Sequence, residues 1–146
     1  MPDNLLDIIL VEDNPHDIEL TLHALQEHNL ANRVMVLRDG EEAVNYIFRT
    51  GEYSDCGICE HPSLILLDTK LPKIDGLDIL RRIREDERTK SIPVVILSSS
   101  RPDEDRIESY RLGVNSYITK PIEFEKFARN IAQIGLYWAV LNEPPH

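Results

Sequence analysis

The sequence predicts an α/β fold in which a parallel sheet is covered by helices on both faces. Short runs of consecutive apolar residues alternate with amphipathic helical patterns along all 146 residues. Runs of this kind suit strands that are buried on both faces, as in parallel sheets. Their regular alternation with helices predicts a doubly wound arrangement of five strands and five helices in one domain, residues 1–146.

Five segments are the expected strands, at residues 7–11, 33–37, 64–68, 93–97 and 116–119. Because crossover connections between parallel strands are right-handed, few topologies remain. Of these we choose the flavodoxin-like strand order 2-1-3-4-5.

Capping residues place the first two helices. Asn14 is a good N-cap, and Pro15 suits the first helical position after it. Asp39 and Glu42 have the spacing of a capping box, and Gly51 can end the second helix.

Three further helices are expected. The third begins after Asp75-Gly76, the fourth spans roughly 103–112 and stops at Gly113, and the fifth begins near Glu123. The domain core then covers about residues 5–135, with a helical extension over about 136–143.

The last helix carries apolar residues at alternating spacings of three and four. They are Phe124, Phe127, Ile131, Ile134, Trp138 and Leu141. A helix that covers a sheet shows this pattern, and so does a coiled-coil seam. A helix of about 18 residues is roughly 27 Å long, more than short strands need. We therefore expect its last turns to extend past the core and form a homodimer contact.

Composition excludes several classes of protein. The net charge of −10 argues against binding the phosphate backbone of nucleic acids. No apolar stretch approaches the roughly 20 residues that span a bilayer, and the start of the chain does not resemble a signal peptide. A cytoplasmic protein without membrane contact is expected. Cys56 and Cys59 precede a strand, so we interpret them as loop thiols and not as a redox or zinc motif.

Polar residues follow four of the expected strands. Glu12 and Asp13 follow the first, Asp68 ends the third, Ser98 follows the fourth, and Lys120 follows the fifth. The carboxyl ends of parallel strands meet at one edge of the sheet, where open α/β folds place their chemistry. We expect these side chains to converge.

This set suits a Mg²⁺-dependent acyl-phosphate site. Mg²⁺ prefers oxygen ligands and offsets repulsion between carboxylates and a phosphoryl donor, and Mn²⁺ could substitute for it. Asp68 would be the nucleophile, and Glu12, Asp13 and the backbone carbonyl of Lys70 further metal ligands. Lys120 could neutralise a phosphoryl oxygen, and Ser98 could donate a hydrogen bond to another.

These residues, taken together, closely resemble the receiver domain of two-component response regulators. The matching residues are Glu12-Asp13, Asp68, Leu71-Pro72, Asp75-Gly76, Ser98, Tyr117 and Lys120-Pro121. The resemblance covers essentially the whole chain. It implies that Asp68 accepts phosphate from the phosphohistidine of a histidine kinase. It also implies that Ser98 moves toward the phosphoryl group while Tyr117 turns inward. Ser98 stands where many receivers have threonine, and the hydroxyl group is retained.

A finer resemblance is to the small regulators of bacterial and cyanobacterial phytochromes. It is carried by Asp39-Gly40, the long loop before the third strand, Ile92-Pro93-Val94-Val95, Ser109-Tyr110, Val114-Asn115-Ser116-Tyr117 and Tyr137-Trp138. It implies that the partner kinase is a light sensor.

Two other classes of protein fit the sequence less well. A haloacid-dehalogenase-like phosphatase would need a second Asp two residues after the nucleophile, where this chain has Lys70. A flavodoxin-like ligand-binding module would need a phosphate-binding loop after the first strand, where Glu12 and Asp13 would repel phosphate.

The expected output is a contact with another protein. The chain ends about five residues after the last helix, so we expect a stand-alone regulator without an attached output domain. The expected signalling face comprises the fourth helix, the fifth strand and the fifth helix. Such a protein is not an enzyme, because it catalyses only its own phosphorylation and dephosphorylation.

Overall fold

The computed structural model describes residues 6–27, 31–50, 62–98, 109–120, 125–127 and 129–133. Five parallel strands form one sheet in the order β2-β1-β3-β4-β5, which confirms the predicted topology. The strands are β1 (Leu6–Val11), β2 (Ala31–Leu37), β3 (Leu64–Asp68), β4 (Val94–Ser98) and β5 (Ser116–Thr119). The helices with complete bounds are α1 (Pro15–Glu27), α2 (Gly40–Phe48) and α3 (Gly76–Glu85).

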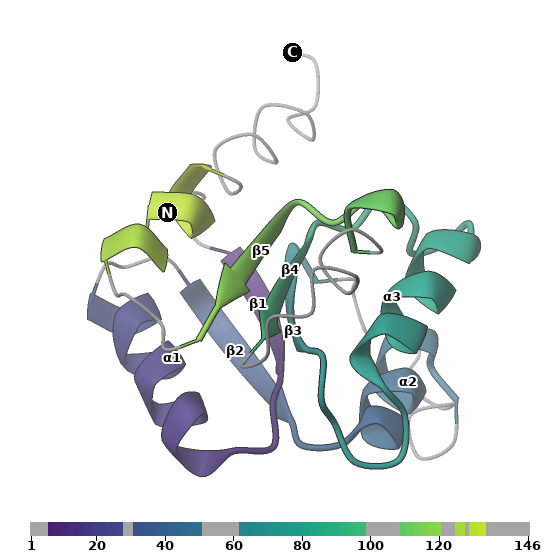
Figure 1. Ribbon diagram of the computed structural model, residues 1–146, viewed down its shortest axis with the longest axis horizontal. Coiled ribbons are helices and arrows are strands. Elements are labelled where there is room, and N and C mark those ends of the chain that lie inside the picture. Colours follow the sequence, from purple (N-terminus) through teal and green to yellow (C-terminus); the bar gives the residue numbers. More distant parts are fainter. Residues whose placement is uncertain are drawn as a thin grey trace.

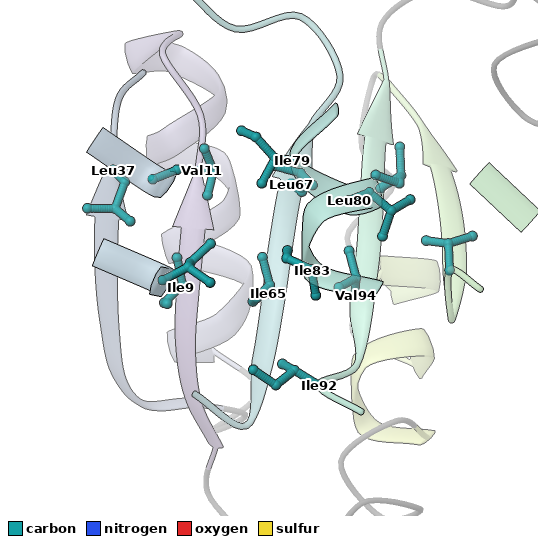
Figure 2. Close-up of a cluster of buried hydrophobic side chains, with 14 residues drawn as sticks. Ile9, Val11, Leu37, Ile65, Leu67, Ile79, Leu80, Ile83, Ile92 and Val94 are labelled. Atoms are coloured by element: carbon teal, nitrogen blue, oxygen red, sulfur yellow. The ribbon is translucent and has the colours of Figure 1, made fainter. Parts of the chain in front are cut away.

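Helices cover both faces of the sheet. Figure 1 shows α1 and the helical residues 125–127 and 129–133 on one face, and α2 and α3 on the other. Each face buries its own apolar cluster. Figure 2 shows Ile79 of α3 beside Leu67 of β3 and Ile83 beside Ile65, and Leu80 lies nearer to β4.

Strand β3 shows why the strands of this sheet have continuous apolar sequences. Ile65 and Leu67 pack in the cluster under α2 and α3, whereas Leu64 and Leu66 pack in the cluster with α1. All five residues of the strand are buried, Asp68 included. Because both faces are covered, no alternation of polar and apolar residues develops.

Both predicted helix caps are present. Asn14 Oδ1 accepts from the backbone N–H of Asp17 at 3.1 Å, and Asp39 Oδ1 accepts from that of Glu42 at 2.7 Å. The prediction for the end of the second helix was wrong, because α2 ends at Phe48, before Gly51. Arg49 adopts the left-handed conformation there, with φ 55°.

The predicted end of the fourth helix is confirmed. Gly113 has φ 80°, its N–H donates to the carbonyl of Tyr110, and the N–H of Val114 donates to that of Ser109. This is the Schellman arrangement that glycine favours. Residues 103–108, which the sequence assigned to that helix, lie outside the described residues, as do residues 136–143, Trp138, Cys56 and Cys59. Phe127 and Ile131 of the fifth helix are buried against the α1 face.

Arg84, a half-buried residue of α3, forms hydrogen bonds at the amino edge of the sheet with the segments that precede β4 and β5. Its guanidinium group donates to the backbone carbonyls of Lys90, Ile92, Leu112 and Gly113 and to Oδ1 of Asn115. Burial lowers the pKa of this group from its ordinary value. Across the described ranges, no helix is long and apolar enough to span a bilayer.

The left-handed residue at the end of α2 gives a test of this description. A side chain with a Cβ atom costs about 1–2 kcal/mol in that conformation. We expect Arg49→Gly to raise the free energy of unfolding by about 0.5–1 kcal/mol, part of the gain being offset by unfolded-state entropy. Arg49→Ala, which keeps Cβ, is the control. Urea denaturation in which the glycine variant is no more stable than the alanine variant would contradict the prediction.

Candidate metal centre at the carboxyl edge of the sheet

Four strands deliver the predicted polar residues to one edge of the sheet. Glu12 and Asp13 follow β1, Asp68 is the last residue of β3, and Ser98 is the last residue of β4. Lys120 follows β5, and its backbone N–H donates to the backbone carbonyl of Ser98 at 2.7 Å. This is the lower edge of the sheet in Figure 1, where β1 leads into α1 and β3 leads toward α3.

Three carboxylates form a cluster that could hold a metal ion. Glu12, Asp13 and Asp68 each place one oxygen within 4.8 Å of the others. Glu12 and Asp68 are buried, whereas Asp13 is exposed and keeps the cluster open to solvent. An all-oxygen set with one open side fits Mg²⁺ or Mn²⁺, which bind a few carboxylates and retain water.

When no metal is bound, Lys120 is the positive charge that contacts the carboxylates among the described residues. Its Nζ contacts Oε1 of Glu12 and lies 2.9 Å from Oδ2 of Asp17 and 3.4 Å from Oδ2 of Asp68. The side chain of Lys120 is only 8% exposed. An ammonium group has three N–H donors, and three carboxylates accept from them here.

Burial and the crowding of charged groups shift the pKa values of Glu12 and Lys120. Burial and the neighbouring Asp68 raise the pKa of Glu12 to about 8, although Lys120 acts in the opposite direction. Burial alone would lower the pKa of Lys120, but its hydrogen bonds to Glu12 and Asp17 and the charge of Asp68 outweigh this and raise it. Without a metal, therefore, Glu12 binds a proton more readily than an exposed carboxylate does.

The Ser98 hydroxyl lies beside a second hydroxyl that the sequence did not point to. Ser98 is fully buried, and Thr69 Oγ1 donates to Ser98 Oγ at 3.3 Å. Tyr117 packs against the cluster under α2 and α3. Its hydroxyl is buried without a hydrogen-bond partner in the part of the chain that the structure describes.

The backbone around Asp68 is closely packed. The N–H of Lys70 donates to Asp68 Oδ1 at 3.2 Å, and the N–H of Gly76 donates to the carbonyl of Thr69 at 3.0 Å. A Cβ atom at Gly76 would lie 2.1 Å from the carbonyl oxygen of Asp68. Only glycine therefore lets α3 begin so close to the acceptor residue. The carbonyl of Lys70 as a metal ligand stays a prediction.

Sequence reasoning missed two residues of this edge, Asp17 and Thr69. Asp17 lies in the first turn of α1, where an acidic residue needs no explanation beyond helix stability, and its contact with Lys120 depends on the fold. Thr69 follows Asp68 directly, and a lone threonine after a strand gives no signal of its own.

Comparison with known proteins identifies the family. The response regulator receiver domain matches residues 8–132 of this chain. The chain belongs to this family. It is 37% identical to response regulator Rcp1 of Synechocystis sp. (strain ATCC 27184 / PCC 6803 / Kazusa) over 131 residues, which cover 90% of this chain and 87% of Rcp1.

Solved structures of receivers share the fold. The bacteriophytochrome response regulator RtBRR is 49% identical, with a TM-score of 0.81 over 97% of this chain and 84% of that one. The phosphorylated cyanobacterial phytochrome response regulator RcpA is 39% identical, with a TM-score of 0.78 over 97% and 99%. The Mn²⁺-bound form of Rcp1 is 35% identical, with a TM-score of 0.77 over 97% and 99%. The resemblance to receivers and to phytochrome regulators is thereby confirmed.

The crowding of carboxylates makes a testable prediction about stability. Like charges about 5 Å apart repel by about 1 kcal/mol in water. We expect Asp13→Asn to raise the free energy of unfolding of the metal-free protein by about 1 kcal/mol. The variant should also lose the stabilisation that Mg²⁺ gives the parent, which is about 1.4 kcal/mol at ten times the dissociation constant.

Urea denaturation with and without Mg²⁺ measures both effects. Glu19→Gln, which removes an exposed acid of α1, is the control for net charge. A metal-free Asp13→Asn protein less stable than the parent would show that the cluster is not under electrostatic strain.

Proposed function

We propose that this protein is a response regulator that accepts a phosphoryl group on Asp68 from the phosphohistidine of a histidine kinase. The observation that carries the proposal is the contact of Asp68 with Lys120 inside a cluster of three carboxylates. The phosphorylated RcpA and Mn²⁺-bound Rcp1 structures support it. The protein would catalyse only its own phosphorylation and dephosphorylation.

The chain's own residues have distinct roles in this reaction. A carboxylate oxygen of Asp68 forms a bond to phosphorus while the bond from phosphorus to the kinase histidine nitrogen breaks, and the nitrogen keeps the electron pair. Bound Mg²⁺ supplies charge stabilisation to the transferring group. The ligands that would hold the Mg²⁺ ion are Glu12, Asp13, Asp68 and the carbonyl of Lys70. Lys120 neutralises a phosphoryl oxygen.

The same proposal covers the switch. The phosphoryl group brings new acceptor oxygens, and the hydroxyl of Ser98, now beside Thr69, would turn to donate to one of them. Tyr117 would then occupy the space that Ser98 leaves. Tyr117 lies in β5, and Ser98 of β4 pairs with Thr119 of β5, which supports an output face of the fourth helix, β5 and the fifth helix. The phosphoryl group shifts the population toward the state that it binds better.

Phosphorylation is tested by intact-mass measurement. With acetyl phosphate and Mg²⁺, the parent should gain the mass of one phosphoryl group, and Asp68→Asn should gain none because it lacks the nucleophile. Asp39→Asn, which removes an acid at the start of α2, should label as the parent does. Equal labelling of the parent and Asp68→Asn would refute the assignment of Asp68.

The donor is tested in the same assay with kinases in place of acetyl phosphate. Similarity to RtBRR and RcpA supports a phytochrome kinase. We expect transfer from such a kinase to be at least tenfold faster than from an unrelated histidine kinase. Equal rates would leave the receiver function intact and refute the phytochrome pairing.

A homodimer contact through residues 136–143 belongs to the proposal as well. Trp138 is the largest apolar residue of that segment. We expect Trp138→Asp to be monomeric in analytical ultracentrifugation at concentrations where the parent is dimeric, because a buried charge without a partner opposes association. A variant that stays dimeric would place the contact elsewhere.

A further inference from the structure

Asp17 has no part in the proposed reaction, yet it contacts the ammonium group of Lys120. Its Oδ2 lies 2.9 Å from Nζ, whereas Oδ2 of Asp68 lies 3.4 Å from it. Asp17 is not one of the three carboxylates that gather their oxygens for a metal. A fourth acid thus shares the only cation that these carboxylates contact among the described residues.

We propose that Asp17 is a positioning residue that holds Lys120 partly away from the metal ligands and so strengthens the binding of a divalent cation. The inference rests on the proposed function in one respect, which is that Glu12, Asp13 and Asp68 are the cation site. It assigns to Asp17 a contribution to metal affinity without direct contact with the metal.

The number of donors on Lys120 carries the argument. Its three N–H groups are shared among Glu12, Asp17 and Asp68. A divalent cation on Glu12 and Asp68 competes for their oxygens and repels the ammonium group. Asp17 is the partner that Lys120 keeps when the cation binds.

Loss of Asp17 would weaken cation binding in two ways. One negative charge disappears from the neighbourhood of the site. The ammonium group of Lys120 also keeps only Glu12 and Asp68 as partners. An incoming cation must then compete with a stronger interaction between Lys120 and these two metal ligands. Both effects have the same sign, which makes the direction of the prediction unambiguous.

The start of α1 places Asp17 for this role. Asn14 caps the helix by accepting from the backbone N–H of Asp17. The side chain of Asp17, at the third helical position, reaches the residue after β5. The carboxylate is only 22% exposed, so solvent screens its contact with Lys120 incompletely.

Isothermal titration calorimetry with MgCl₂ tests the inference on the unphosphorylated full chain. We expect Asp17→Asn to bind Mg²⁺ about three- to tenfold more weakly than the parent. Glu19→Gln removes the same charge from the exposed side of the same helix and should stay within about twofold. Asp17→Glu, which keeps the charge, should recover part of the affinity.

A second readout separates this role from a merely structural one. In acetyl phosphate labelling, the Mg²⁺ concentration that gives half of the maximal rate should rise for Asp17→Asn, while the rate at saturating Mg²⁺ stays within about twofold of the parent. Asp17→Ser, which keeps a side chain that suits a first helical turn, serves if the asparagine variant folds poorly.

The inference is overturned if Asp17→Asn and Asp17→Ser bind Mg²⁺ as tightly as Glu19→Gln does, or more tightly than the parent. A parent protein that fails to bind Mg²⁺ at all would overturn the proposed metal site, and with it this inference. The two kinds of failure are told apart by the parent titration alone.

Discussion

The constraint on which this structure depends is the spacing of neighbouring parallel strands. β1 and β3 are adjacent in the sheet, and adjacent strands lie about 4.8 Å apart. The acids at their ends, Glu12, Asp13 and Asp68, therefore cannot separate without breaking the sheet. Their crowding is held in place by the burial of the strands beneath them. Lys120 reaches the cluster from β5, beyond β4, on a long flexible side chain. The folded protein thus holds an excess of negative charge that an added cation relieves.

The glycine and hydroxyl residues around the cluster serve the same arrangement. Gly76 lets α3 begin in contact with the backbone carbonyl of Asp68, so that the helix start packs directly against the acceptor residue. The buried hydroxyls of Thr69 and Ser98 hydrogen-bond to each other next to the acceptor and add no charge. The charged groups of the cluster are therefore the acids and Lys120, and Gly76, Thr69 and Ser98 beside them are neutral.

Much of this could be predicted from the sequence, because the informative features were local. Continuous apolar runs gave the buried strands, and strand ends located Glu12, Asp68 and Lys120. Asn14 and Asp39 marked helix starts because a cap acts within three residues. The end of α2 was mispredicted because Gly51 was the obvious stop, whereas Arg49 accepts the left-handed conformation at some cost. The contact of Asp17 with Lys120 joins two distant segments, so no local pattern could reveal it.

The two edges of the sheet differ in how their cations are balanced. At the carboxyl edge, Lys120 contacts three carboxyl groups, so its surroundings respond to metal and added charge. At the amino edge, Arg84 is surrounded by peptide carbonyls and an amide oxygen, which are dipoles without net charge. Contacts of that kind are little affected by ionic strength. We therefore expect the hydrogen bonds of Arg84 to persist when the charge at the carboxyl edge changes, so that β4, β5 and α3 keep their positions at the amino edge.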